Sequence, residues 1–271
     1  MSNLLKEFPT ISEIAYQEYQ KHVHVRDVMT TTVLTISPDA SMQDVSKIMG
    51  ERHVGSLVVV EMDIPTGIVT ERDLLSKVIA SDRDSAKVKA REVMSTRLIT
   101  VRPTDTIKEA AQTMIQQKGR LIVLKEGKVV GIITTSDLIR TLPRIPETMM
   151  KVDDVMTKKV VSVAPETSVG ETAKMMGKMR IGSVLVSDTG KPKGIFTERD
   201  LLTKVLSRRL SMESKVGELA SSPIVSILSG SSIHRAALTM VSKHIRRLPV
   251  IGDGEIVGIV TARDLVEAYS R

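Results

Sequence analysis

Short apolar runs and one amphipathic stretch alternate along residues 25–80. Val33–Ile36 is rich in β-branched residues and predicts a strand, and a Ser-capped helix follows with apolar positions 42, 45, 48 and 49 on one face. Leu57–Val60 is apolar throughout and too short for a helix, so it predicts a buried strand. Gly67–Thr70 predicts a further strand, and Glu71–Ile79 predicts a second helix. The order is strand, helix, strand, strand, helix.

The string Gly-apolar-apolar-Thr-x-x-Asp ends this unit and occurs four times, at Gly67–Asp73, Gly131–Asp137, Gly194–Asp200 and Gly258–Asp264. The Asp residues are 64 (73 to 137), 63 (137 to 200) and 64 (200 to 264) positions apart. A fixed period predicts one structural unit copied four times. We expect α/β repeats, each β-α-β-β-α, at 25–80, 88–142, 151–206 and 215–270. Residues 1–24 have apolar positions on helical spacing and are expected to dock on the repeats.

A unit of about 55 residues buries too little surface to be stable alone, so the repeats should pair. Pro143 and Pro146 stiffen the junction between the second and third repeats. We therefore expect two modules, at 25–142 and 151–270. In each module the sheets would meet with helices outward, and together the modules would form a flat disc.

Composition narrows the function classes. The chain has no Cys, which excludes disulfides and thiolate metal sites, and no apolar run reaches the length of a membrane span. The N-terminus lacks a signal-peptide pattern, so a cytoplasmic location is expected. No phosphate-binding loop, dinucleotide fingerprint or metal-binding His cluster occurs. We expect no metal, no catalytic cofactor and no enzyme activity.

The net charge of +7 is unevenly distributed. Residues 25–80 hold 5 basic and 8 acidic side chains, whereas residues 88–142 hold 10 and 5. Such a surface favours anionic partners, either nucleotides, RNA or an acidic protein, although it also serves solubility. The candidates for RNA contact are Arg97, Arg102, Lys108, Lys158, Lys159, Arg208 and Arg209.

The repeated Thr and Asp have two interpretations. Thr at an N-cap with an acid three residues later is a helix capping box. However, a box tolerates several residue types, whereas all four copies here use Thr and Asp. An Asp one turn into a helix can accept both hydroxyls of a ribose, and unpaired N–H groups at the helix start favour phosphate. Arg72, Arg199 and Arg263 precede the Asp in three copies and could bind phosphate.

Together with the openings Asp27-Val28-Met29, Glu92-Val93-Met94 and Asp154-Val155-Met156, these strings give the chain a resemblance to four tandem cystathionine-β-synthase (CBS) domains. The resemblance covers about residues 25–270. The fourth repeat departs from it at Glu218-Leu219-Ala220. CBS domains pair as Bateman modules and bind AMP, ADP, ATP or S-adenosylmethionine in clefts between paired domains.

The resemblance implies roles for individual residues. The ribose ligands would be Asp73, Asp137, Asp200 and Asp264. The phosphate ligands would be Thr70, Arg72, Thr134, Thr197, Arg199, Thr261, Arg263, Arg246 and Arg247. The adenine contacts would be Ile68, Ile132, Ile195, Ile259, Thr30, Leu34, Val54, Ser95, Ile99, Thr157, Val161, Ile181, Val225 and Ile245. Ser136 replaces the Arg in the second repeat, so its cleft should differ.

Three functions remain open from the sequence. The first is a sensor of adenine nucleotides that regulates a separate partner protein. The second is a basic factor that associates with RNA or the ribosome under nucleotide control. The third is a regulator that binds S-adenosylmethionine. No membrane partner is expected, and the oligomeric state stays open, with a homodimer among the options.

Overall fold

The computed structural model describes residues 23–142, 149–188 and 190–270. Backbone contacts divide the chain into two compact units, and we describe each by itself. The 1–3 unit comprises Val33–Leu98 and Val160–Val225, and so contains the cores of repeats 1 and 3. Among the described residues, the 2–4 unit comprises 23–32, 99–142, 149–159 and 226–270, with the cores of repeats 2 and 4.

Each repeat contributes a three-stranded sheet and its helices. The 1–3 unit contains β1 (Thr35–Ile36), α3 (Met42–Glu51), β2 (Ser56–Glu61), β3 (Ile64–Thr70), α4 (Glu71–Asp73), η1 (Leu74–Val78), η2 (Ile79–Ser81), α5 (Ala90–Val93), β7 (Ser162–Val163), α8 (Val169–Met179), β8 (Ser183–Asp188), β9 (Lys191–Thr197), α9 (Glu198–Asp200), η5 (Leu201–Leu206) and α10 (Val216–Leu219). The 2–4 unit contains α2 (Val25–Val28), β4 (Ile99–Val101), α6 (Ile107–Gln117), β5 (Leu121–Lys125), β6 (Lys128–Ile133), α7 (Thr135–Ile139), η4 (Val152–Asp154), β10 (Ile227–Leu228), α11 (Ile233–Lys243), β11 (Arg247–Gly252), β12 (Glu255–Thr261) and α12 (Ala262–Ser270).

The four sheets share one topology. In the first, β1 runs parallel to β2, and β2 pairs antiparallel with β3. The apolar run of β2 explains its central position, because Leu57, Val58 and Val59 are all fully buried. The hairpin that follows β2 has a register shift at Val59/Val60, and the equivalent shift recurs in the other three sheets. The sequence repeat is therefore also a backbone repeat.

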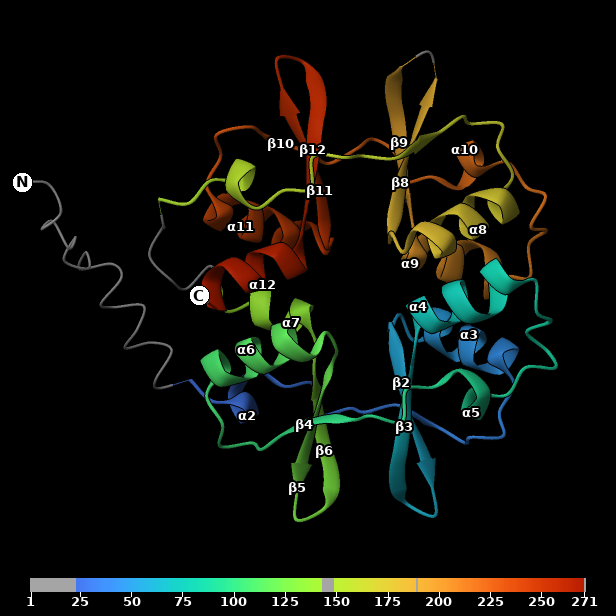
Figure 1. The fold of residues 1–271 in the computed structure, drawn as a ribbon, viewed down its shortest axis with the longest axis vertical. Coiled ribbons are helices and arrows are strands. Elements are labelled where there is room, and N and C mark those ends of the chain that lie inside the picture. Colours follow the sequence, from blue (N-terminus) through green and yellow to red (C-terminus); the bar gives the residue numbers. More distant parts are fainter. Residues whose placement is uncertain (1–22, 143–148, 189, 271) are drawn as a thin grey trace, which may run out of the picture. The chain divides into compact units, whose positions relative to one another are not determined.

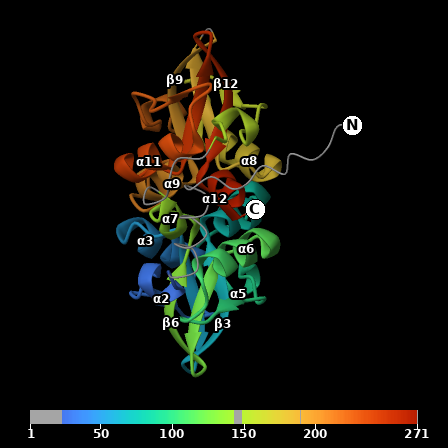
Figure 2. The same ribbon diagram turned by 90° about the vertical axis from the view of Figure 1, so that its left-hand side faces the viewer.

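Helices fill the space between the two sheets of each unit (Figure 1). In the 1–3 unit, α3 packs on η5 and α8 packs on η1 and η2. In the 2–4 unit, α12 packs on α6 and α7, and Figure 2 shows these helices between β6 and β12. The cores interpenetrate, because Leu202 of repeat 3 joins the repeat 1 cluster and Leu75 of repeat 1 joins the repeat 3 cluster.

Two glycines allow the close helix approach in the 1–3 unit. A β-carbon on Gly50 would lie 2.5 Å from Cβ of Ser207, and one on Gly177 would lie 2.5 Å from Cβ of Ala80. Both glycines occupy the ninth position of their helices, α3 and α8. The same position in α6 and α11 holds Ile115 and Val241. Repeats 1 and 3 thus share a small-residue packing surface that repeats 2 and 4 lack.

The predicted order of strands and helices is confirmed, with two differences. The helix expected over 71–79 changes after one turn into π-helical geometry at Leu74–Val78, and the equivalent change occurs at Leu201–Leu206. The packing of repeat 1 on 3 and of 2 on 4 was not predicted. The cores of repeats 1 and 2 belong to different units, so the expected pairing of their sheets stays a prediction. The N-terminal segment (to residue 22) and the proline junction lie outside the described residues. No helix in the described part of the chain is long and apolar enough to cross a membrane.

Candidate functional site

The repeated Thr and Asp form a capping box in every repeat. In repeat 1 the Thr70 hydroxyl donates to Oδ2 of Asp73 (2.6 Å), and the Thr70 amide donates to the same oxygen (2.9 Å). The same two bonds measure 2.6 and 2.9 Å at Asp200. They measure 2.7 and 2.8 Å at Asp137, and both are 2.7 Å at Asp264. One oxygen of each carboxylate is therefore committed to the helix start.

The amide groups at the helix start are largely occupied, which corrects the expectation that they stay unpaired. The Asp73 amide donates to the Thr70 hydroxyl (3.2 Å), and the Glu71 amide donates to the carbonyl of Gly55 (3.1 Å). In repeat 3, the amides of Asp200 and Glu198 are bonded in the same way. The helix start therefore offers phosphate less than an open terminus would, because the cap and a neighbouring carbonyl already satisfy these donors.

The second carboxylate oxygen has a different environment in each type of repeat. In repeats 1 and 3 a lysine four residues later reaches it, with Lys77 Nζ and Lys204 Nζ each 2.8 Å from Oδ1 of Asp73 and Asp200. The π-helical turn follows each Asp directly. These lysines were missed in the sequence, although the shared Asp-x-x-x-Lys spacing could have revealed them.

Repeats 2 and 4 have no lysine at this position, since Thr141 and Ala268 stand there. Asp137 is 4% exposed, and its Oδ1 lies 3.5 Å from Nη1 of Arg140. Burial raises the pKa of Asp264, opposed by its hydrogen bonds to Thr261. The four carboxylates are thus chemically distinct despite their common motif.

Opening segments are exchanged between repeats, which brings hydroxyl groups to the carboxylates. The Thr30 hydroxyl, from the opening of repeat 1, donates to Oδ1 of Asp137 in repeat 2 (3.2 Å). The Ser221 hydroxyl, from the opening of repeat 4, donates to Oδ1 of Asp200 in repeat 3 (2.9 Å). Ser221 was not among the predicted residues. Each of these two contacts lies within one unit, and the pairing of repeats 1 with 2 and 3 with 4 stays a prediction.

The predicted adenine-contact isoleucines meet these exchanged segments. The backbone bridges join Ile132 to Thr30, Ile68 to Ser95, Ile259 to Thr157 and Ile195 to Ser221. The other predicted contacts are not brought to those bridges. Leu34 and Val54 pack on the repeat 1 core, and Val161 and Ile181 pack on the repeat 3 core. Ile99 is buried, whereas Val225 and Ile245 are half-buried, so their proposed adenine contacts stay predictions.

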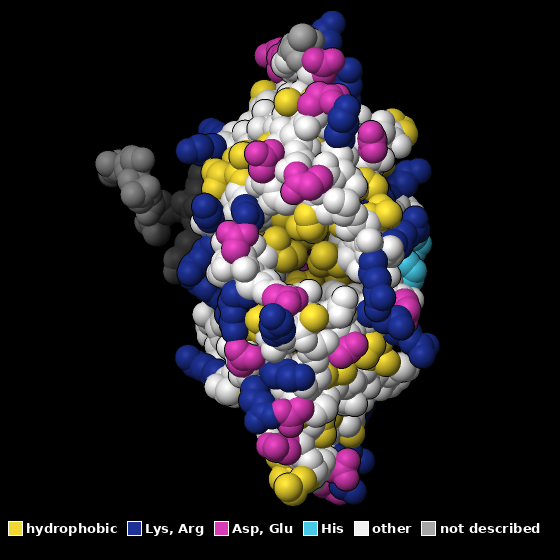
Figure 3. Space-filling model, turned by 90° about the vertical axis from the view of Figure 1, so that its right-hand side faces the viewer, with side chains coloured by type: hydrophobic (Ala, Val, Ile, Leu, Met, Phe, Trp, Pro, Cys, Tyr) yellow, Lys and Arg dark blue, Asp and Glu magenta, His cyan; other side chains and the backbone are white. Residues whose placement is uncertain are grey.

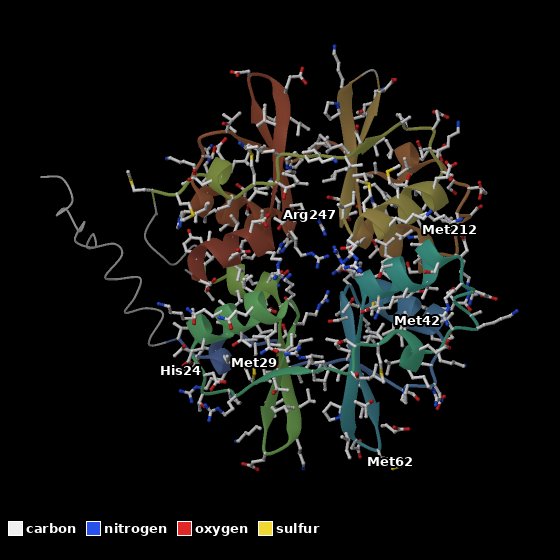
Figure 4. All side chains as sticks on the ribbon, viewed as in Figure 1. His24, Met29, Met42, Met62, Met212 and Arg247 are labelled. Atoms are coloured by element: carbon white, nitrogen blue, oxygen red, sulfur yellow. The ribbon has the colours of Figure 1, made fainter. Side chains whose placement is uncertain are left out.

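The glycine of each string allows close approach, not only a turn. A β-carbon on Gly67 would lie 2.5 Å from Sδ of Met94, and one on Gly131 would lie 2.6 Å from Sδ of Met29, which Figure 4 labels. Met156 covers Gly258 in the same way. The methionine of each of these three openings therefore packs on the strand that precedes a Thr-x-x-Asp.

The predicted phosphate-binding arginines already make protein contacts. Arg72 Nη2 lies 3.1 Å from Oε1 of Glu198 and Arg199 Nε lies 2.7 Å from Oε1 of Glu71, so the two ion pairs join repeats 1 and 3. Arg263 donates to the carbonyl of Ile115 (3.0 Å). A phosphate would have to share these guanidinium groups.

The last two predicted phosphate ligands lie at the start of β11. Arg247, labelled in Figure 4, pairs with Thr261 in the β11–β12 register, and the Arg246 carbonyl accepts the amide of Ala262 (2.9 Å). The strand pairing therefore places both next to the Thr-x-x-Asp of repeat 4.

Comparison with known proteins agrees with this geometry. The model of the CBS domain matches residues 25–80, 90–144, 152–207 and 216–271. A Methanocaldococcus jannaschii protein, described as a proposed archaeal homologue of g-AMPK, has a crystal structure with a TM-score of 0.77. The match covers 91% of this chain and 100% of that one at 22% identity, and shows the fold alone. A Pyrococcus horikoshii protein matches with a TM-score of 0.64 at 23% identity, over 91% of this chain and all of that one.

Curated relatives match parts of the chain. A Thermofilum pendens protein named for its place in a ribosomal RNA operon is 32% identical over 61% of this chain and 59% of its own length. A Methanocaldococcus jannaschii protein is 28% identical over 90% of this chain, and the match covers 61% of that relative. The chain thus spans about 60% of these two relatives. Four tandem matches are the arrangement expected for two Bateman modules, and the chain belongs to the CBS-domain family.

Proposed function

We propose that the chain is a non-catalytic sensor that binds adenine nucleotides (AMP, ADP or ATP) and regulates a separate partner. The observation that supports it best is the hydroxyl held against Oδ1 of Asp137 and of Asp200. In each carboxylate, Oδ2 accepts hydrogen bonds from its own helix start, and Oδ1 accepts one from a hydroxyl of another repeat. A ribose hydroxyl makes the same hydrogen bond, so it would replace Thr30 or Ser221.

Family membership supports the choice of ligand, because membership in the CBS family implies that an adenosine compound binds at this Asp. The arginines suit a phosphorylated ligand, since guanidinium groups form charge-assisted bonds with phosphate. Arg72 and Arg199 are 49% and 30% exposed at their side chains, and each also donates to a backbone carbonyl, of Arg180 and of His53, so a phosphate would have to compete with these contacts. S-adenosylmethionine lacks phosphate and offers these groups only its single carboxylate.

Calorimetry with AMP, ADP, ATP and S-adenosylmethionine tests the proposal. Asp200→Asn keeps the size of the side chain but removes its charge, and it should weaken nucleotide binding about tenfold or more. Asp153→Asn is a matched control, because Asp153 bonds Ser229 and Gly230 and belongs to no Thr-x-x-Asp string. Tight binding of S-adenosylmethionine alone would favour the other ligand class. Equal nucleotide affinity in all four Asp→Asn variants would reduce the strings to helix caps.

A second candidate is association with RNA or ribosomal particles. Six of the seven predicted contact residues are exposed, and Lys108 is half-buried. Arg102 pairs with Asp105 (3.0 Å), and in the view of the 1–3 unit in Figure 3 acidic side chains lie among the Lys and Arg. The best candidate is Lys158-Lys159, two adjacent exposed cations. This function would use the phosphate backbone and not base recognition, since aromatic residues are only 2% of the chain.

A further inference from the structure

A cavity of about 260 Å³ opens in the 1–3 unit, beside the start of the β9 hairpin strand and the short helix α10. Its floor includes Val186, Gly194 and Ala220, and its rim carries Lys193, Lys215, Glu166 and Glu218. Gly194 and Phe196 are buried on one face of β9, and Phe196 belongs to the repeat 3 core. Since side chains alternate along a strand, the Ile195 side chain lies on the opposite face. The cavity lining includes none of Thr197, Asp200 and Ser221, although Ser221 adjoins the lining residue Ala220.

The cavity exists where repeat 4 departs from the other openings. Met29, Met94 and Met156 each place a sulfur atom over the glycine of a neighbouring strand. At the equivalent position Ala220 covers Gly194 with a single methyl group, 2.9 Å from where a β-carbon on Gly194 would lie. The missing atoms are those of a methionine side chain beyond its β-carbon. The cavity is lined by Gly194 and Ala220, so it lies where the methionine side chain extends at the other openings.

A second departure leaves the rim open. Arg26 and Arg91 directly precede the acid of their openings, and their amides donate to the carbonyls of Pro103 and Pro38 (both 3.0 Å). Gly217 makes the same bond to Pro165 (2.9 Å), so the backbone is preserved. The Arg91 side chain continues to an ion pair with Asp39, whereas Gly217 has no side chain to reach Glu166, the equivalent of Asp39. Both changes remove atoms at one place.

The charges at the rim are balanced. Lys215 pairs with Glu166 (2.5 Å), and Lys193 pairs with Asp188 (2.7 Å). All four side chains are at least 51% exposed, and exposed pairs are weak because water screens them, so a ligand can replace these contacts. Two lysines beside two glutamates disfavour a polyphosphate, because the carboxylates repel it. A ligand with one positive and one negative group fits better.

We propose that this cavity binds a free zwitterionic α-amino acid whose side chain is unbranched, apolar and about as long as methionine. The side chain would occupy the space that methionine fills at the other three openings. The ligand ammonium would pair with Glu166 or Glu218, and the ligand carboxylate with Lys193 or Lys215. The site has a different lining from the proposed nucleotide site and would give the chain a second input.

Calorimetry and thermal shift on the full chain, with L-methionine and L-norleucine at up to about 10 mM, test this inference. We expect both amino acids to bind and to raise the melting temperature, whereas glycine and an N-acetylated methionine amide should not. Ala220→Met supplies the missing side chain, so it should weaken methionine binding at least about tenfold while AMP affinity stays unchanged. The AMP measurement shows whether the nucleotide proposal holds, separately from whether the cavity binds methionine.

Charge variants keep the test informative if Ala220→Met does not fold. Glu218→Gln and Lys193→Gln lie on the exposed rim, and each should weaken methionine binding several-fold without lowering stability. Absence of methionine binding to the wild-type chain would overturn the inference. So would equal binding of the blocked amide, or equal binding by every variant.

Discussion

Arg199 Nε lies 2.7 Å from Oε1 of Glu71, a residue of another repeat. The pair has a symmetric counterpart, because Arg72 Nη2 lies 3.1 Å from Oε1 of Glu198. Both glutamates are buried, at 4% and 7% exposure, and each directly follows the capping threonine of its own repeat. The arginine of each string therefore neutralises the acid of the other, and this exchange of charges holds repeats 1 and 3 together.

Removing one member of this pair should be costly. Arg199→Met leaves the Glu71 carboxylate buried without its guanidinium partner, and we expect the free energy of unfolding to fall by about 2–3 kcal/mol. The loss is smaller than for a fully buried pair because Arg199 keeps 30% exposure. Urea denaturation measures it. Arg91→Met, which breaks the exposed pair with Asp39, is the matched control and should cost about 0.5 kcal/mol or less.

The double variant Glu71→Gln/Arg199→Met completes a thermodynamic cycle. It should lose less stability than the sum of the single variants, because no uncompensated carboxylate remains. Strict additivity would show that the two side chains do not interact in solution.

A β-carbon at the helix crossing should also destabilise the 1–3 unit. Gly177→Ala would place a methyl group 2.5 Å from Cβ of Ala80 and 3.0 Å from the Leu75 carbonyl. In an open helix this substitution stabilises by about 1 kcal/mol, so a loss of stability would demonstrate the close contact. We expect a loss of about 1–3 kcal/mol by chemical denaturation. Lys178→Ala, on the exposed side of the same helix, should be nearly neutral, and a stabilised Gly177→Ala would refute the crossing.

The fold was accessible from the sequence because its signals are local. The apolar run Leu57–Val60, the cap at Ser41 and the repeated Thr-x-x-Asp each fix one element through neighbouring residues. Four copies made the assignment robust. The capping interpretation and the ligand interpretation of Thr70 and Asp73 were both legitimate, and the structure shows that the cap is present whatever else binds.

The partners of the site residues were less accessible, because they depend on which repeats pack together. Nothing near Arg72 in the sequence indicates Glu198, which lies two repeats away. Gly50 and Gly177 carried a usable signal, since only repeats 1 and 3 have glycine at the ninth helical position. Ser221 was hidden by the altered opening of repeat 4, where the methionine that marks the other openings is Ala220.

The pH dependence of stability should distinguish two carboxylates. Burial raises the pKa of Asp264, so its folded form holds a proton more tightly than its unfolded form. Its contribution to stability is therefore fully present below the unfolded pKa and is lost as pH rises through the folded pKa. Hydrogen bonds from Ser229 and Gly230 lower the pKa of Asp153, whose contribution is present above the unfolded pKa and is lost as pH falls through the folded pKa.

Urea denaturation from about pH 3 to pH 7 measures both trends. The stability of the wild-type chain relative to Asp264→Asn should decrease with rising pH. Relative to Asp153→Asn it should increase. Because the two trends with pH should have opposite signs, each variant is a control for the other. Trends of the same sign would contradict the environments assigned to Asp264 and Asp153.

Salt dependence tests whether the basic residues bind nucleic acid. If Lys158 and Lys159 contact phosphates, binding releases counterions, so the logarithm of RNA affinity should fall linearly with the logarithm of salt concentration. Lys158→Glu/Lys159→Glu should reduce the magnitude of that slope by about 1–2 on single-stranded RNA. A charge reversal at Lys118 and Lys128 changes net charge equally at positions outside the candidate set, and should alter the slope less. AMP affinity should stay constant in both variants. Should the wild-type chain show no RNA retention even at low salt, the +7 charge serves solubility, and a protein partner becomes the target of the proposed sensor.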